Sequence, residues 1–268
     1  MAGPRVEVLT TGFELCEAPR VDDAGAVWFT DVLGGGVRRW SPDGTIELVV
    51  PKRRGVGGLA LHRDGGVVVS GRDVTHVGPD GTNRLVFAPP DGVTGFNDIC
   101  ALPDGSVVAG ALRFRPFGGE QPVPGEFWHV ERGGERVLVD DIDWANGCGA
   151  IDDRVYVCDY ARGIVHVCDS TGCRVFARTP AGEADGLAVD GEGGVWVAQP
   201  RAGSIVRFDP AGTVTRTVEL PGQQPASLAF GGDGAPMYVT TIATDGTPAA
   251  LLRVDAGVSG PRHHLATL

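Results

Sequence analysis

The feature that most constrains the fold is a repeat with a period near 40 residues. Six apolar positions, each opening a short β-branched or aromatic run, follow one another at steps of 40, 40, 48, 40 and 42 residues. These anchors are Val27, Val67, Val107, Val155, Val195 and Met237. Several short strands in each unit of this length are typical of a propeller blade. The repeat predicts an all-β, six-bladed β-propeller with four antiparallel strands per blade, a single domain over residues 1–268.

A second pattern lies nine to eleven residues before each anchor, where the innermost strand should begin and point into the central channel. This position holds Glu17, Gly57, Asn97, Asn146, Asp185 and Ala226. Four of the six carry oxygen ligands, and converging carboxylates and amides repel one another or lack partners without a cation. An all-oxygen set with two negative charges predicts a central divalent metal, Ca²⁺ first, with Zn²⁺, Mn²⁺ and Mg²⁺ as alternatives.

Composition restricts the class of partner. The net charge of −11 argues against nucleic acid, whose phosphates it would repel. The first residues form no apolar signal region, and no apolar stretch is long enough for a membrane span. We therefore expect a cytoplasmic protein that acts on a small molecule, with its oligomeric state open. In that compartment, the six cysteines are expected to be buried thiols.

The second strand of each unit should return to the metal face, so the loops leaving it would form the walls of a pocket. The surplus of the third unit lies in this loop, residues 113–124, which contains two Phe, two Arg and three Pro. Such an insertion at the mouth of a metal site is typical of a lid or specificity loop. The same reasoning places Asp31 and Asp159, which end two of the second strands, around the metal.

Several motifs in this chain resemble those of the senescence marker protein/regucalcin/gluconolactonase family of six-bladed propellers, which is related to diisopropyl fluorophosphatase. They are C-E-A-P-R from Cys16, G-F-N-D from Gly95, W-A-N-G from Trp144 and the long run from Ala184 to Ala198. The resemblance implies a metal-dependent lactonase with Glu17, Asn146 and Asp185 as direct ligands. It also implies that Asn97 lies in the metal shell or holds the substrate, and that Asp185 is the catalytic base or nucleophile.

Two positions depart from the family's sugar lactonases. Gly95 stands where they carry Arg, and Gln121 stands where they carry Glu. Both family residues contact sugar hydroxyls, so we expect a less polyhydroxylated substrate here. The expected substrate contacts are Asn97, Asp98, Arg113, Arg115, Phe117, Gln121 and Asp159, with Phe114 as a further apolar wall.

Three functions remain open on this reasoning. The first is a hydrolase that opens a lactone or related ester through a cation-polarised carbonyl and an activated water. The second is a metal-dependent isomerase, epimerase, cyclase or lyase on the same scaffold. The third is a non-catalytic propeller that acts as an interaction module, because a fold alone does not decide function.

Overall fold

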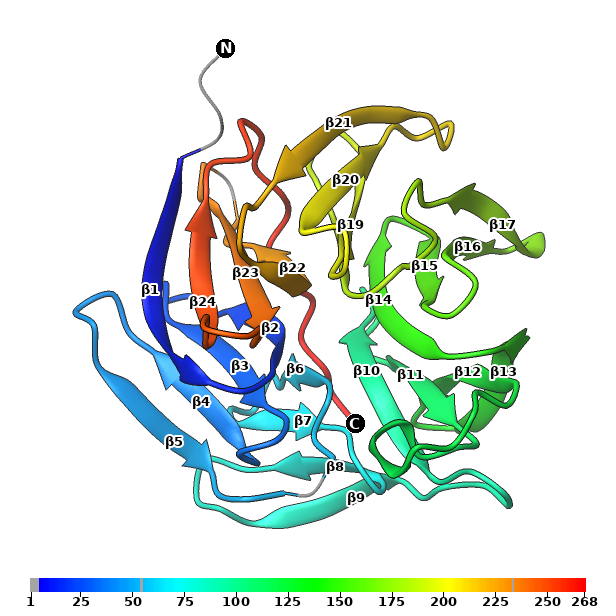
Figure 1. The fold of residues 1–268 in the computed structure, drawn as a ribbon. Coiled ribbons are helices and arrows are strands. Elements are labelled where there is room, and N and C mark those ends of the chain that lie inside the picture. The colour runs from blue at the N-terminus through cyan, green and yellow to red at the C-terminus, as the bar shows by residue number, and fades with distance from the viewer. Residues whose placement is uncertain (1–4, 54, 233) are drawn as a thin grey trace.

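The computed structural model describes residues 5–53, 55–232 and 234–268. Within them, 24 strands form six four-stranded antiparallel sheets arranged in a ring around a central channel (Figure 1). This is the predicted six-bladed β-propeller. In the same residues, no helix is long and apolar enough to cross a bilayer.

Each blade runs from an inner strand at the channel to an outer strand at the rim. Blades 1 to 3 are β2 (Cys16–Val21), β3 (Val27–Asp31), β4 (Val37–Trp40) and β5 (Ile46–Val50); β6 (Leu59–Leu61), β7 (Val67–Val69), β8 (Val74–Val77) and β9 (Asn83–Phe87); β10 (Gly95–Ala101), β11 (Val107–Leu112), β12 (Gly125–Glu131) and β13 (Gly134–Ile142). Blades 4 and 5 are β14 (Ala145–Ile151), β15 (Arg154–Asp159), β16 (Ile164–Asp169) and β17 (Gly172–Arg178); β18 (Leu187–Val189), β19 (Val195–Gln199), β20 (Ser204–Phe208) and β21 (Val214–Glu219).

Blade 6 closes the ring with strands from both ends of the chain. It comprises β22 (Gln224–Phe230), β23 (Met237–Ile242), β24 (Ala249–Val254) and, outermost, β1 (Val6–Phe13). The register of the last pair places Val6 opposite Val254 and Phe13 opposite Ala249.

The sequence repeat corresponds directly to the strands. Every anchor lies at or within one residue of the start of its blade's second strand. The tight turns before these strands have a recurring brace. In blade 5, Asp190 accepts hydrogen bonds from the Gly194 amide at 2.8 Å and the Trp196 indole at 2.7 Å. Asp22 binds the Trp28 indole in the same way in blade 1, at 2.9 Å.

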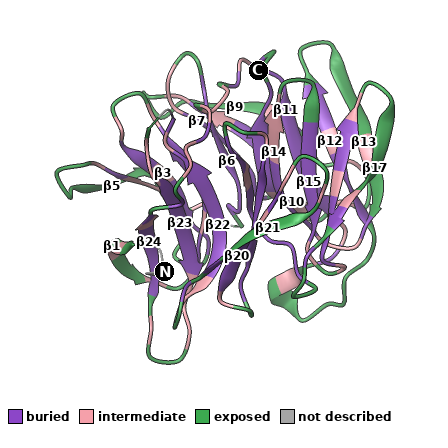
Figure 2. Cartoon of the chain, turned by 90° about the horizontal axis from the view of Figure 1, so that it is seen from above, coloured by how far each residue is buried: buried purple, intermediate pink, exposed green. Residues whose placement is uncertain are grey.

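The core lies between the blades, where the inner three strands of neighbouring sheets pack face to face (Figure 2). Trp196 is fully buried and meets Phe230 of the next blade edge-on, with 6.1 Å between ring centroids. Burial of one such side chain contributes about 1.5–3 kcal/mol. Outer strands such as β5 and β9 are mostly exposed, so the inner strands are held far more firmly than the rim.

The cysteines require one correction. Cys168 and Cys173 are opposite each other across the β16–β17 hairpin and form a disulfide, so they are not free thiols. The other four cysteines, Cys16, Cys100, Cys148 and Cys158, are free and buried as expected. The prediction failed for this pair because it rested on the expected reducing compartment, whereas the hairpin places the two cysteines directly opposite each other.

Candidate active site

The four oxygen-bearing residues lie where the inner strands begin, at one mouth of the channel. Glu17 is the second residue of β2, Asn97 the third of β10 and Asn146 the second of β14. Asp185 lies two residues before β18. The remaining two blades contribute no polar side chain at this level, because the corresponding residues are Gly57 and Ala226.

A shared irregularity brings these side chains to the channel. The pairing of β2 with β3 skips between Glu17 and Arg20, and that of β14 with β15 skips between Ala145 and Cys148. β10 and β22 have register shifts at the same repeat position. Such bulges bend a strand and redirect its side chains. The ligand positions therefore face the axis instead of alternating between the two faces of each sheet.

Backbone contacts between blades fix this ring. The Asn97 side-chain amide donates to the Ala145 carbonyl at 3.0 Å, which leaves its Oδ1 as an acceptor. The Gly186 amide donates to the Ala226 carbonyl at 2.8 Å. Close packing matters as well, since a Cβ on Gly57 would lie 2.5 Å from Asn97 Oδ1. The glycine of blade 2 thus provides the space that the Asn97 amide occupies.

The ring concentrates buried negative charge. Burial, followed by the nearby Asp185 and Asp98 carboxylates, raises the pKa of Glu17 well above its usual value. Burial and the carboxylates of Glu183 and Asp98 likewise raise the pKa of Asp185, although a hydrogen bond from the Asn146 side chain opposes the shift. Asp185 Oδ1 is buried and has no hydrogen-bond partner among the described residues.

These observations test whether the residues fit a metal ion. A buried carboxylate oxygen without a donor is costly, and a cation would satisfy it. The donor set is two carboxylates and two amide oxygens, the ligand type that hard divalent cations prefer. Among the described residues, no three His, Cys, Asp or Glu side chains are grouped to hold a metal, so the two amide oxygens are needed to complete this set. The residues fit a hard cation.

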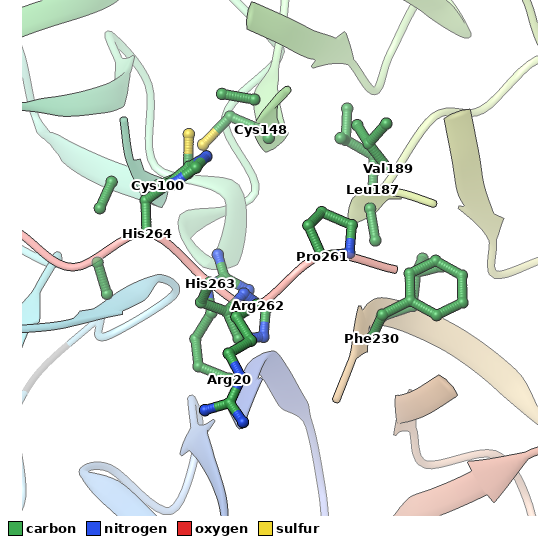
Figure 3. Close-up of a pocket in the computed structure, with 16 residues that line it drawn as sticks. Arg20, Cys100, Cys148, Leu187, Val189, Phe230, Pro261, Arg262, His263 and His264 are labelled. Carbon is green, nitrogen blue, oxygen red and sulfur yellow. The ribbon is translucent and has the colours of Figure 1, made fainter. Parts of the chain in front are cut away.

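A second charged layer lies beneath the ring. Asp98 is buried, and its Oδ1 lies 3.5 Å from Arg20 Nη2. Burial raises the pKa of Asp98 to about 6, against the opposing effect of Arg20. Below this pair is a cavity of about 70 Å³ whose lining includes Arg20, Cys100, Cys148, His263 and His264 (Figure 3). Asp98 is therefore paired with a residue of the deeper layer.

The remaining expected substrate contacts lie outside the ring. Asp159 is fully buried and accepts the Asp143 and Trp144 amides at 3.1 and 3.3 Å. In the loop of residues 113–124, Arg113 forms a two-bond pair with Glu126, and Arg115 pairs with Glu120 at 2.9 Å.

Three other residues of this loop complete the picture. Phe117 is 68% exposed on the short 3₁₀ turn η1 (Pro116–Gly118), and Gln121 is exposed. Phe114 was expected to form a pocket wall, but it is packed in the core instead. Roles for the exposed loop residues in binding stay predictions.

Gly95, where the family's sugar lactonases are expected to carry Arg, is enclosed by backbone. A Cβ on Gly95 would lie 2.9 Å from the Gly71 carbonyl oxygen, because the Phe96 amide donates to that same carbonyl at 2.7 Å. A longer side chain at position 95 would require the β7 exit to move. The backbone contact between blades 2 and 3 thus leaves room only for glycine at this position.

Sequence reasoning missed a group on blades 4 and 5. Glu183 is buried two residues before Asp185, and the Tyr160 hydroxyl lies 3.4 Å from its Oε2. Arg201 approaches the same carboxylate at 3.8 Å and lies over the Tyr160 ring. The available signal was position, because Tyr160 and Arg201 follow the strand ends Asp159 and Gln199 by one and two residues.

Known proteins resemble this chain over nearly its whole length. Residues 15–243 match the SMP-30/Gluconolactonase/LRE-like region. Pentonolactonase XacC of Haloferax volcanii is 28% identical over 260 residues, covering 91% of this chain and 87% of the relative. L-arabinolactonase of Azospirillum brasilense is 30% identical over 238 residues, covering 82% and 78%.

Solved structures of similar proteins share the fold of this chain. Regucalcin of Agrobacterium tumefaciens, described as a calcium-binding protein, superposes with a TM-score of 0.83 at 22% identity, and the match covers 100% of this chain and 98% of that one. With the family match spanning most of the chain and the propeller ring in place, this protein belongs to the SMP-30/gluconolactonase/LRE-like family.

Proposed function

We propose that this protein is a hydrolase that opens a lactone or a related ester at the ring of Glu17, Asn97, Asn146 and Asp185. The observation that carries the proposal is the buried Asp185 carboxylate, whose Oδ1 has no partner among the described residues. Evolution rarely retains an unsatisfied buried charge without a use for it. Two relatives named for lactone hydrolysis, the pentonolactonase and the L-arabinolactonase, support the reaction class.

We further propose that the ring holds a divalent cation, Ca²⁺ first, through oxygens of Glu17, Asn146, Asp185 and Asn97. The chemistry such an ion supplies when bound is polarisation of a carbonyl oxygen and a lower pKa for water. The name of the calcium-binding structural relative favours this metal over Zn²⁺, Mn²⁺ or Mg²⁺.

The chain's own residues supply the rest of the reaction. Asp185 accepts the proton of the attacking water, or itself attacks the ester carbon. When water attacks, the ester C–O bond breaks and the ring oxygen takes the proton that Asp185 accepted, which gives the hydroxy acid. When Asp185 attacks, the same bond breaks and leaves an acyl anhydride on Asp185, which a water then hydrolyses to release the hydroxy acid. Asn97, fixed through its amide to the Ala145 carbonyl, presents its Oδ1 to the cation or, in the alternative role, to the substrate.

The enclosed Gly95 supports a restricted substrate range. Without a guanidinium at this position, the mouth loses a donor for sugar hydroxyls, and a site without such donors discriminates weakly in favour of them. We therefore expect glucono-1,5-lactone to be a poorer substrate than less polyhydroxylated lactones. The partner is a small molecule, and a cytoplasmic location stays a prediction of the sequence.

A lactone panel followed by proton release tests the proposal. Turnover should require added Ca²⁺, stop with a chelator, and give a product heavier than the substrate by one water. An isomerase or lyase would give a product of unchanged total composition. Turnover of glucono-1,5-lactone above all simpler lactones would contradict the expected range.

Metal binding can be checked without catalysis. A ligand at 100 times its Kd stabilises a protein by about 2.7 kcal/mol, so Ca²⁺ should raise the Tm of the wild type. Glu17→Gln removes one charged ligand and should abolish most of this shift. An equal shift in both proteins would place the ion elsewhere.

A further inference from the structure

A continuous stack of side chains connects the core to the rim of the mouth across three blades. Phe114, buried in blade 3, meets Trp144 edge-on with 5.3 Å between ring centroids. Trp144 packs against Tyr160 at 4.9 Å, and the Tyr160 amide donates to the Trp144 carbonyl at 2.9 Å. We call Phe114, Trp144 and Tyr160 the aromatic ladder. The Arg201 guanidinium of blade 5 lies over its last ring, 5.9 Å from the centroid.

The outer end of the ladder is attached to the candidate active site. Glu183, two residues before Asp185, accepts the Ala202 amide at 3.1 Å and lies 3.4 Å from the Tyr160 hydroxyl. Burial, followed by the Asp185 and Glu183 carboxylates, raises the pKa of Tyr160 to about 12. The phenol is therefore neutral at physiological pH, and the charge of the Asp185 carboxylate contributes to its raised pKa.

Arg201 differs from other arginines on this face in how its charge is used. Arg113 is held by two bonds to Glu126, and Arg162 is paired with Asp143 at 2.7 Å. Arg201 has one long contact of 3.8 Å to Glu183, and its side chain is 79% exposed. Its guanidinium retains donors that can form two parallel bonds to a planar oxyanion.

We propose that Arg201, supported by the aromatic ladder, binds a carboxylate substituent of the substrate while the ester lies at the Asp185 ring. The inference rests on the proposed lactone hydrolysis and specifies the substrate class of that site. A chain with a net charge of −11 and buried carboxylates at its mouth repels an anionic substrate. A cation at the rim offsets this repulsion, and the Tyr160 ring limits the positions that the guanidinium can take.

The test compares two lactones that differ only in charge: a γ-lactone bearing a ring carboxylate, and its primary carboxamide. In Arg201→Gln, KM for the carboxylate should rise about 10- to 100-fold, the loss typical of a charge-assisted pair, while KM for the carboxamide stays within about twofold. Tyr160→Ala should act in the same direction and Tyr160→Phe, which keeps the ring, much less. The matched control is Arg174→Gln on β17, which removes an exposed ion pair with Asp169 at the end of β16.

The outcomes separate the two proposals. Equal losses on both lactones, or no change on the carboxylate, would overturn the role of Arg201 and leave lactone hydrolysis standing. If the wild type hydrolyses neither lactone, the proposed reaction fails, and Trp144 fluorescence then reports binding of the same carboxylate, with Trp144→Phe as the blank. A Kd that rises in Arg201→Gln would still support the anion site, and an unchanged Kd or no fluorescence response would overturn it.

Discussion

The two ends of the central channel differ in what occupies them. At the mouth, Glu17, Asn146 and Asp185 lie at or just before the starts of their inner strands. They bring two carboxylates and an amide into a buried ring where one oxygen, Asp185 Oδ1, has no partner among the described residues. At the other end, the chain itself fills the channel. Its last residues run into the centre of the ring (Figure 1), where Ala266 exchanges backbone hydrogen bonds with Leu61 and Arg63 at 2.8 and 2.9 Å.

The difference shows which end of the channel stabilises the folded state and which end destabilises it. The backbone of the far end is satisfied, with Ala266 fully buried in a hydrophobic cluster and the Thr267 amide bonded to the Gly105 carbonyl at 2.9 Å. One neutral side-chain atom there, His263 Nε2, is buried without a partner among the described residues. The mouth retains charges that oppose folding in the absence of a cation. Changes at the mouth should therefore affect chemistry, and changes at the far end should affect the free energy of unfolding.

The largest effect is expected from Asp185→Asn. Loss of the proton acceptor should reduce kcat by roughly 10²–10⁴-fold. Without added metal, the free energy of unfolding in urea should stay equal or rise, because a buried charge without a partner has been removed. A variant with near-wild-type kcat, or one that no longer folds, would contradict the view that residues at the mouth serve chemistry and not stability.

The second effect is expected at the far end, from Ala266→Asp. A carboxylate at this fully buried position would enter a cluster of apolar side chains, so the free energy of unfolding should fall by about 2–4 kcal/mol. KM of the folded protein should not change. A raised KM with unchanged stability would mean that the two ends are coupled through the channel.

The sequence predicts the two ends of the channel unequally well. The mouth was predictable because Glu17, Asn97, Asn146 and Asp185 occupy one phase of the repeat, and a propeller places one phase around one axis. The last fourteen residues follow β24 and have no repeat phase, so their path into the channel depends on long-range contacts that no local pattern encodes. The aromatic ladder was missed for a related reason, because Phe114, Trp144, Tyr160 and Arg201 come from three separate blades.

A third test uses pH at the far end. Burial, aided by Arg20 and His264, lowers the pKa of His263 to about 3, against about 6.5 when unfolded. The folded state therefore favours the neutral ring, and stability is lost as pH falls below about 6.5 because only the unfolded chain takes up this proton. The stability that the wild type loses between pH 7 and pH 5 should be about 1–2 kcal/mol smaller in His263→Asn, measured by urea unfolding. Identical pH profiles would show that the ring is solvated.

The smallest effect comes from two glycines at the channel, Gly57 just before the inner strand β6 and Gly149 on the inner strand β14. Gly57→Ala would place a methyl group 2.5 Å from Asn97 Oδ1 at the mouth, so the Kd for Ca²⁺ should rise about fivefold, roughly 1 kcal/mol. Gly149→Ala would meet the flexible end of Leu187 at 2.9 Å beside the cavity and should leave that Kd unchanged. Calorimetric titration distinguishes them. A larger rise in the Kd for Ca²⁺ from Gly149→Ala than from Gly57→Ala would place the metal site nearer the cavity than the mouth.

The closure of blade 6 by β1 has a consequence for how the protein is made. β1 ends at Phe13, but its partner β24 ends only at Val254, so the ribosome must add about 240 residues before the first strand can pair. At about 5–20 residues per second, this takes roughly 10 to 50 s. Throughout that interval β1 is an unpaired edge on a growing open ring, exposed to pairing with other nascent chains. A slower or crowded translation should therefore increase aggregation without any change in the stability of the finished propeller.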